Sequence, residues 1–249
     1  MRFHEKTVLV IGGNSGIGQA SARAFAGEGA NLFITGRDQR TLDATKTEIG
    51  GACTAFRADV SDPDSLDPVI AAIKERHGTL DALFVNAGVG GFSPARELTP
   101  ELWDHINDIN CRGCFFAAQK ALPLMTKGGS ILFTGSIGSV LALPGNTAYA
   151  AAKAGLRAVA RIMAKELVDD GIRVNMISPG PIETPLMNRN AGMDSIAVDG
   201  LRQTMIAAVP MKRMGEADEV ARAVLFLSSQ EASFITGVDL FVDGGCVEL

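Results

Sequence analysis

Short apolar segments alternate along the chain with longer segments in which apolar residues recur at helical spacing. The short segments are continuously apolar, which is typical of strands covered on both faces, as in a parallel sheet between helical layers. We expect strands at residues 8–11, 32–34, 82–85, 131–133, 174–177 and 238–242, with a weaker one near 53–58. We expect helices at residues 16–28, 39–49, 63–77, 100–124, 148–170 and 216–228. The alternation predicts a single α/β domain over residues 1–249, built on a doubly wound parallel sheet of about seven strands.

The composition describes a globular protein with a large core, because 47% of the residues are apolar and 20% are charged. The formal net charge of −5 argues against nucleic acid or an anionic membrane as a partner. The polar N-terminal residues carry no signal-peptide pattern, and no apolar run approaches the ~20 residues that span a bilayer. We therefore expect a cytoplasmic protein with no membrane partner.

Two of the four cysteines, Cys111 and Cys114, have the C-x-x-C spacing of a redox or zinc pair. A zinc site needs further ligands, and the three histidines fall in no ligand-like cluster. We therefore interpret both thiols as small side chains facing the core, and expect no metal.

A glycine-rich loop, 12-GGNSGIG-18, follows the first strand and leads into a helix. Glycines let the backbone approach a pyrophosphate, and the start of a helix offers free N–H groups to an anion. The spacing is G-x-x-x-G-x-G and not the usual G-x-G-x-x-G, but the position between strand and helix predicts a dinucleotide site of the Rossmann type.

The end of the second strand bears on the choice between NAD and NADP. Gly36 stands where a carboxylate that binds the ribose of NAD is expected, and Arg37, suited to a 2′-phosphate, follows it. Asp38 is well placed to cap the next helix instead. We therefore expect NADP as the cofactor, with Arg37 among its ligands.

Tyr149 is the chain's only tyrosine, and Lys153 follows it by four residues, so both lie on one face of a helix. In isolation such a pair is more often a half-buried aromatic beside a surface lysine. A free phenol has a pKa of about 10, which is too high for easy proton transfer in both directions at neutral pH. It can serve as general acid and base only where its surroundings favour the phenolate. A neighbouring ammonium supplies such an effect.

Several further residues occur in order over essentially the whole chain and together with the loop resemble the short-chain dehydrogenase/reductases. They are Asp59-Val60, Asn86-Ala87-Gly88, Asn110, Ser136, Tyr149-x-x-x-Lys153 and Pro179-Gly180. Two positions depart from the family: Ile11 replaces a threonine before the first glycine, and Val85 replaces the first asparagine of Asn-Asn-Ala-Gly. Neither departure touches the reacting atoms.

The resemblance implies a catalytic set of Asn110, Ser136, Tyr149 and Lys153. Tyr149 is the expected general acid and base, and Ser136 a second hydrogen-bond donor to the substrate oxygen. Lys153 is expected to hold the nicotinamide ribose, and Asn110 a water of a proton relay. The expected cofactor-binding residues are Gly12, Asn14, Ser15, Gly16, Ile17, Gly18, Arg37, Asp59, Val60, Asn86, Ala87, Gly88, Tyr149, Lys153, Pro179, Gly180, Ile182 and Thr184.

Residues 186–210 lie where the family carries a mobile lid over the substrate. Their apolar members favour an uncharged, partly apolar ketone or secondary alcohol; these members are Leu186, Met187, Met193, Ile196, Val198, Leu201, Met205 and Ile206. The helix from residue 148 is small or apolar nearly all round, so that one face needs a partner. We expect a homotetramer or dimer formed through this helix and the helix at 100–124, as in the family.

The leading interpretation is an NADP(H)-dependent oxidoreductase that acts on a small ketone or alcohol. A 3-oxoacyl-[acyl-carrier-protein] reductase shares every motif, and requires a basic patch for its acidic carrier, for which Arg112, Lys120, Arg157 and Arg161 are candidates. A non-catalytic NADP-sensing protein is the alternative from another class. The complete catalytic set argues against it, because a sensor has no need of a proton relay.

Overall fold

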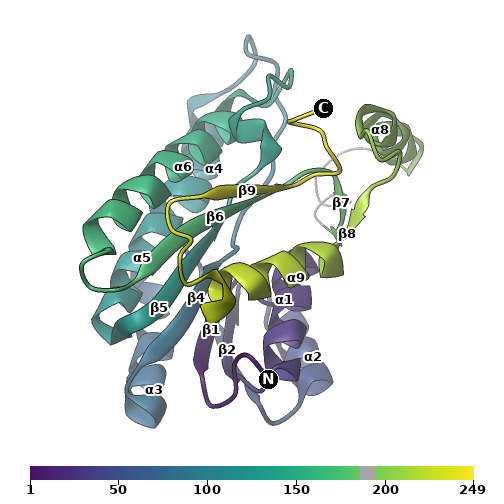
Figure 1. Cartoon of the computed structure of the whole chain (residues 1–249). Helices are drawn as coiled ribbons and strands as arrows, with labels where there is room; N and C mark the ends of the chain where they lie inside the picture. Colours follow the sequence, from purple (N-terminus) through teal and green to yellow (C-terminus); the bar gives the residue numbers. More distant parts are fainter. Residues whose placement is uncertain (186–194) are drawn as a thin grey trace.

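A parallel sheet of seven strands, in the order β3-β2-β1-β4-β5-β6-β9, forms the centre of the computed structural model, which describes residues 1–185 and 195–249 (Figure 1). The chain builds β1, β2 and β3 outward to one side and returns to place β4 on the other side of β1, so the winding reverses there. The predicted doubly wound sheet is thus confirmed. Its strands are β1 (Thr7–Ile11), β2 (Asn31–Gly36), β3 (Cys53–Arg57), β4 (Leu80–Val85), β5 (Met125–Thr134), β6 (Arg173–Pro179) and β9 (Asp239–Val242).

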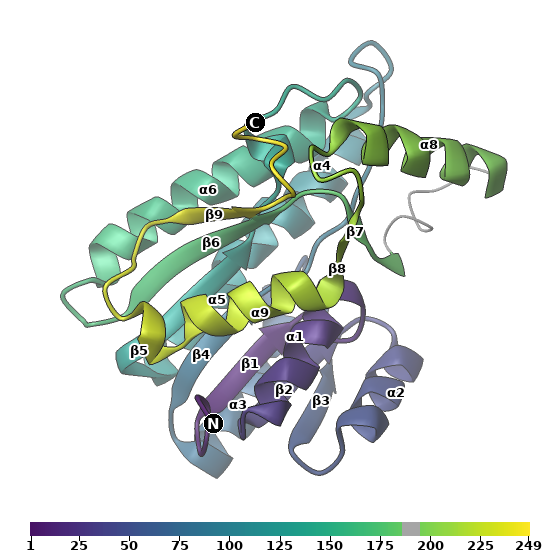
Figure 2. The same cartoon turned by 45° about the vertical axis from the view of Figure 1, so that its right-hand side comes forward.

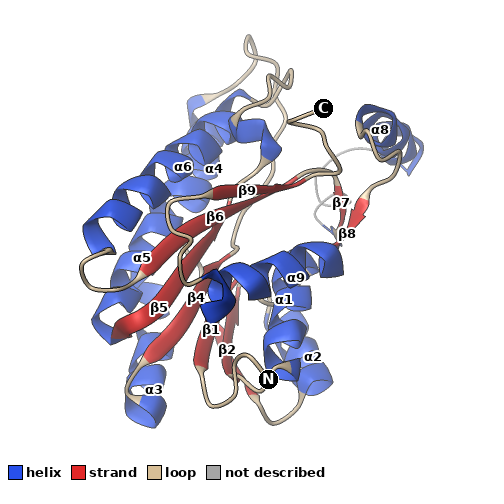
Figure 3. Ribbon diagram, viewed as in Figure 1, coloured by secondary structure: helices blue, strands red, loops and turns tan. Residues whose placement is uncertain are grey.

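Helices cover both faces of the sheet (Figure 3). Buried residues of α1, α2 and α9 pack on one face, and those of α3, α5 and α6 on the other, with α4 against α6. The helices are α1 (Gly16–Gly27), α2 (Gln39–Ile49), α3 (Asp67–His77), α4 (Pro100–Asn107), α5 (Cys114–Ala121), α6 (Thr147–Leu167), α8 (Ser195–Ala208) and α9 (Ala217–Ser228). Short 3₁₀ turns are η1 (Pro63–Leu66), η3 (Leu122–Leu124), η4 (Ile137–Ser139) and η5 (Gln230–Ala232).

The helices on both faces of the sheet explain why the strands are continuously apolar in sequence. Side chains of a strand alternate between its faces. In β1, Leu9 and Ile11 enter the core under α5 and α6, whereas Val8 and Val10 enter the core under α1 and α9. Both faces are buried, so no polar position interrupts the run.

The helix expected at 100–124 is interrupted. A π-helical turn, η2 (Asp108–Gly113), separates α4 from α5. Gly113 allows the wider turn to lie against the segment after β3, because an added Cβ would overlap the Val60 carbonyl oxygen. The turn carries Asn110, which it buries completely. β5 is also longer than the expected 131–133, since Met125–Gly129 extend it without an apolar pattern.

Beyond the main sheet, a two-stranded parallel sheet pairs β7 (Ile182–Glu183) with β8 (Gly215–Glu216). Helix α8 stands off from the body above this small sheet (Figure 2). Residues 186–194 of the expected lid lie outside the described residues. In the part of the chain that is described, no helix combines the length and apolarity needed to cross a membrane.

Candidate active site

A cavity of about 360 Å³ opens at the carboxyl ends of β1, β2, β3 and β4, where the winding of the sheet reverses. This is the place at which doubly wound sheets bind their ligands. The cavity brings together many of the residues expected to bind the cofactor. Its lining includes Gly12, Asn14, Ser15, Arg37, Asp59, Val60, Asn86, Ala87 and Gly88.

The glycine loop is packed so closely that side chains are excluded from it. Gly12 has φ of 76°, and an added Cβ would lie 2.9 Å from the backbone nitrogen of Ala87. A Cβ on Gly18 would overlap the Gly12 carbonyl oxygen. The Ser15 side chain makes no capping bond at the start of α1, so the first-turn N–H groups stay available to an anion. Loop and helix therefore fit a dinucleotide pyrophosphate.

At the far end of the cavity, the guanidinium of Arg37 is half-exposed and lies 3.9 Å from Asp59 Oδ2. Asp59 Oδ1 accepts hydrogen bonds from the Ser61 amide at 3.0 Å and hydroxyl at 2.8 Å, so the carboxylate is held in place. Asp38 caps α2, as expected, by accepting from the Arg40 amide. Contacts with Arg40 also lower the pKa of Asp38. Arg37 is thus the cation that faces the cavity.

Tyr149 and Lys153 both come from α6, four residues apart, and the lysine is buried although it carries a charge, with 2% of its surface exposed. Its ammonium donates a hydrogen bond of 2.8 Å to the Thr134 carbonyl oxygen at the end of β5. The same ammonium lies 5.8 Å from the centroid of the Tyr149 ring, within the range of a cation–π contact. The structure therefore places a fixed positive charge beside the phenol.

Ser136 is the N-cap residue of η4 and lies two residues after β5 ends. Its hydroxyl oxygen accepts a hydrogen bond of 3.0 Å from the Gly138 amide, which leaves the hydroxyl proton to be donated. A Cβ on Gly138 would lie 3.3 Å from Ser136 Oγ and 3.6 Å from Tyr149 Cε1. Ser136 and Tyr149 thus flank one small space.

Asn110 is bound to the backbone of Val89. Its Oδ1 accepts from the Val89 amide at 2.9 Å, and its Nδ2 donates to the Val89 carbonyl at 2.8 Å. A Cβ on Gly88 would lie 3.0 Å from Asn110 Oδ1 and 3.6 Å from Lys153 Nζ, so the two catalytic candidates are neighbours. The side chain clamps the segment after β4, a role that the sequence did not indicate.

Thr134 was not singled out from the sequence, yet it links the two halves of the site. Besides accepting from Lys153, it donates through Oγ1 to Asn86 Oδ1 at 3.0 Å. Asn86 Nδ2 in turn donates to the Gly12 carbonyl at 3.2 Å. The only sequence signal is the position of Thr134 at a strand end, just before Gly135 and Ser136.

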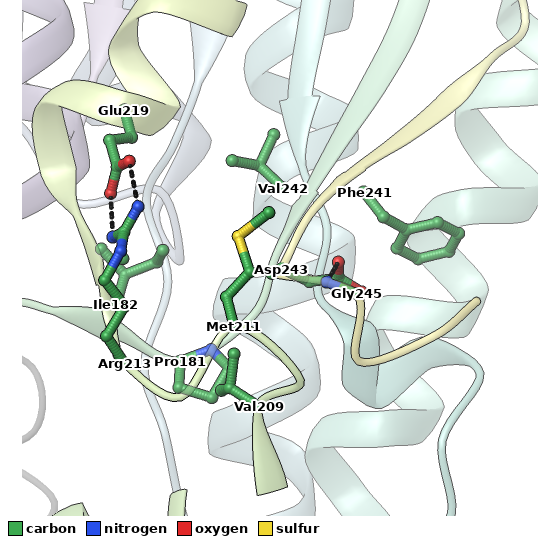
Figure 4. Close-up of a pocket in the computed structure, with 12 residues that line it drawn as sticks. Pro181, Ile182, Val209, Met211, Arg213, Glu219, Phe241, Val242, Asp243 and Gly245 are labelled. Atoms are coloured by element: carbon green, nitrogen blue, oxygen red, sulfur yellow. Dashed lines mark hydrogen bonds and ion pairs between the residues drawn. The ribbon is translucent and has the colours of Figure 1, made fainter. Parts of the chain in front are cut away.

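The residues expected at the nicotinamide end are only partly brought together. Thr184 lies beside the glycine loop, since a Cβ on Gly16 would lie 3.3 Å from Thr184 Cβ, and Pro179 is buried at the end of β6. Gly180 donates its amide to the Val242 carbonyl. The Ile182 side chain instead lines a second cavity, of about 410 Å³, next to the Arg213–Glu219 ion pair (Figure 4).

Exposed apolar side chains lie on two loops that follow candidate site residues in the chain. Phe92 follows the Gly88–Val89 segment, and Val140 and Leu143 follow Ser136; all three are more than two-fifths exposed. The loops touch, because the Ser93 amide donates to the Gly145 carbonyl at 2.8 Å. These residues were missed, as their loops show no periodicity. The other expected contacts with substrate, from residue 186 onward, fall largely outside the described side chains.

The C-x-x-C pair lies at the π-helical turn as two free thiols, with Cys114 buried and Cys111 half-buried. Burial raises the pKa of Cys114 to about 11, and it raises the pKa of Cys111 as well. Such thiols are protonated and poorly reactive at neutral pH. Among residues 1–185 and 195–249 no group of three or more histidine, cysteine or carboxylate side chains is arranged to hold a metal ion.

Known proteins are similar to this chain over almost its whole length. A family model described as Enoyl-(Acyl carrier protein) reductase matches residues 11–247. Oxidoreductase asL5 from Sarocladium schorii is 37% identical over 100% of this chain and 98% of its own. The 3-oxoacyl-[acyl-carrier-protein] reductase FabG from Thermotoga maritima is 34% identical over 99% and 100%. The crystal structure of levodione reductase superposes with a TM-score of 0.93 at 35% identity and covers 98% of each chain.

Proposed function

The chain belongs to the short-chain dehydrogenase/reductase family of oxidoreductases, and on this premise we propose that it is an NADP(H)-dependent enzyme that interconverts a small, partly apolar ketone and its secondary alcohol. The observation that carries the proposal is the buried ammonium of Lys153 beside the Tyr149 ring. Burying a charged group costs free energy, so such groups are found mainly where function or a charged partner requires them.

The chain's own residues supply the proton and the binding of the reacting oxygen. In reduction, the Tyr149 hydroxyl donates its proton to the carbonyl oxygen as negative charge develops there; in oxidation, the phenolate oxygen takes the proton back. The Ser136 hydroxyl donates a second hydrogen bond to the same oxygen. Lys153 stabilises negative charge on the phenol oxygen from its fixed place on Thr134. The coenzyme, when bound, supplies or accepts the hydride.

The glycine cradle and Arg37 support NADP(H) as this coenzyme. The cavity excludes side chains where the pyrophosphate would lie, and its far end presents a guanidinium, the group that pairs best with a phosphate. Asn86 and Gly88 line the cavity, and a Cβ on Gly88 would lie 3.6 Å from Lys153 Nζ, so the cavity reaches the neighbourhood of the lysine.

The exposed apolar side chains of Phe92, Val140 and Leu143, on two loops that touch each other, support an uncharged, partly apolar substrate. A carrier-bound thioester is less well supported. Of the basic residues that a carrier protein would require, Lys120 is bound to Asp64 and Asp67, and Arg157 to Asp239. These carboxylate partners offset the charges of two of the four candidate residues, which weakens the case for a carrier-binding patch.

We further propose that the chain is a single domain that assembles as a homotetramer or dimer in the cytoplasm. Support for assembly comes from the outer face of α6, where Ala151, Ala154, Ala158 and Ile162 are exposed in one stripe. An exposed apolar stripe of this kind favours a partner helix. Support for a reducing compartment comes from the four free cysteines.

The test compares the wild type with Tyr149→Phe, using cyclohexanone, 2-octanone and an acetoacetyl thioester as probe carbonyls and following NADPH oxidation. Loss of the general acid should lower turnover by at least ~10²-fold, while NADPH binding, measured by fluorescence, stays close to that of the wild type. A variant that keeps most of its turnover would disprove the role of Tyr149. A wild type that turns over none of the probes, nor the matching alcohols, would count against the proposed activity itself.

A further inference from the structure

Gly36 and Asn14 occupy one space at the ribose end of the cavity. A Cβ added to Gly36 would lie 2.7 Å from Asn14 Nδ2, and closer still to Cγ and Oδ1 of the same side chain. Both residues line the cavity, together with Arg37 and Thr41. Any side chain at position 36 therefore requires Asn14 to move.

Asn14 is not free to move without loss. Its Nδ2 donates a hydrogen bond of 2.6 Å to Thr41 Oγ1, and the Thr41 hydroxyl donates its single proton to the Asp38 carbonyl at 3.0 Å. Since that proton is committed, Thr41 Oγ1 can only accept, and Asn14 must present its NH₂ group to it. The chain of bonds thereby fixes the Asn14 oxygen on the side of Gly36.

The place that Asn14 fills is the place that an acidic side chain would need. A carboxylate at the end of the second strand binds the ribose hydroxyls of NAD and repels the 2′-phosphate of NADP. Here such a carboxylate meets Asn14 before it reaches a ribose. Meanwhile Arg37, one residue further on, stays half-exposed and its guanidinium is only 3.9 Å from Asp59.

We propose that Asn14 is a specificity-determining residue: locked on Thr41, it keeps position 36 free of a side chain and so commits the ribose end of the cavity to the 2′-phosphate. The proposal rests on the proposed nicotinamide-dependent function. It predicts that affinity for NADH is gained only when Asn14 and Gly36 are changed together, whereas the loss of Arg37 weakens NADPH binding without strengthening NADH binding.

The experiment is a double-mutant cycle over Asn14→Ala and Gly36→Asp, with Kd and kcat/KM measured for NADPH and NADH. Gly36→Asp alone should weaken both coenzymes. The double variant should relieve the overlap and shift the NADH-to-NADPH ratio at least ~10-fold further than the two single changes combined, the scale of coupling between contacting residues. If Gly36→Asp alone switches preference as fully as the double variant, Asn14 is no barrier and the proposal fails.

Two matched variants separate the overlap from the charge. Gly36→Ala adds only the Cβ, so it should weaken both coenzymes about equally and be rescued by Asn14→Ala. Thr41→Val removes the bond that locks Asn14, so it should partly rescue Gly36→Asp. The proposal fails if Gly36→Ala binds both coenzymes as tightly as the wild type. It also fails if neither Asn14→Ala nor Thr41→Val restores the coenzyme binding that the Gly36 variants lose. The thermal midpoint of each variant reports on folding.

The same data distinguish this proposal from the assignment of NADP. A wild type that prefers NADH would refute the assignment. The rescue of Gly36→Ala by Asn14→Ala would still be expected in that case, because it depends on space alone. Arg37→Ala, measured beside the cycle, should weaken NADPH and leave NADH unchanged.

Discussion

Replacing Asn110 by alanine removes both hydrogen bonds that fix the Val89 backbone, at 2.9 and 2.8 Å. The side chain is fully buried, so the loss falls in the interior. An unsatisfied buried backbone group costs about 1–3 kcal/mol. Val89 is itself half-buried, so water replaces part of the loss, and we expect the free energy of unfolding to fall by about 2–4 kcal/mol. Such a loss is a large fraction of the ~5–15 kcal/mol typical of a domain.

The assay is urea unfolding followed by far-ultraviolet circular dichroism, with amide hydrogen exchange at Val89 as a local readout. Asn107→Ala is the matched control, because it makes the same substitution three residues earlier but removes one local bond, to the Trp103 carbonyl. The control should change stability by no more than ~0.5 kcal/mol, as for surface changes in general. If Asn110→Ala is no more destabilising than the control, and Val89 exchanges at the wild-type rate, the clamp does not exist.

Two further predictions concern stability and assembly. Arg173 is buried and donates to the carbonyls of Leu227 and Ser229 at the end of α9, at 2.8 and 2.9 Å. Burial lowers the pKa of Arg173, but its charge-assisted hydrogen bonds outweigh the cost of desolvation. Arg173→Met should therefore lower the free energy of unfolding, measured by urea titration, by ~2–4 kcal/mol. Unchanged stability would mean that desolvation cancels the bonds. Ala154→Glu places a charge in the exposed stripe of α6 and should reduce the sedimentation coefficient at micromolar concentration, while Ala71→Glu on the exposed face of α3 should not. A wild type that already sediments as a monomer would end this proposal.

The sheet and most of the helices could be predicted from the sequence. A strand that is buried on both faces is apolar at consecutive positions, as from Val8 to Ile11. The spacing of Tyr149 and Lys153 also predicted that they are neighbours, since residues four apart lie on one face of a helix. Hydrogen bonds between segments far apart in the sequence could not be predicted, because they produce no local pattern. The bond from Asn14 to Thr41 spans 27 residues, and that from Thr134 to Asn86 spans 48. The two bonds between Asn110 and Val89 likewise join residues that are 21 positions apart.

Hydrogen bonds between distant segments also explain the two departures from the family pattern, Ile11 and Val85. A threonine hydroxyl is missing at Ile11, but the turn after β1 is held by the Gly12 and Gly13 amides, which both donate to the Thr35 carbonyl at 3.0 and 2.9 Å. The Asn86 amide donates to the Ile11 carbonyl at 2.9 Å, and the Asn86 side chain donates to the Gly12 carbonyl. Ile11 can therefore be apolar and fully buried without loosening the turn.

Asn86 does more than replace that hydroxyl. Because Asn86 also accepts from Thr134, whose carbonyl binds Lys153, one series of hydrogen bonds runs from the glycine loop to the Lys153 ammonium. It crosses the ends of β1, β4 and β5, which are adjacent in the sheet. The position of the glycine loop and the position of the ammonium beside Tyr149 are thus set by the same strands. Val85 needs no polar side chain in this arrangement, and it completes the buried end of β4 instead.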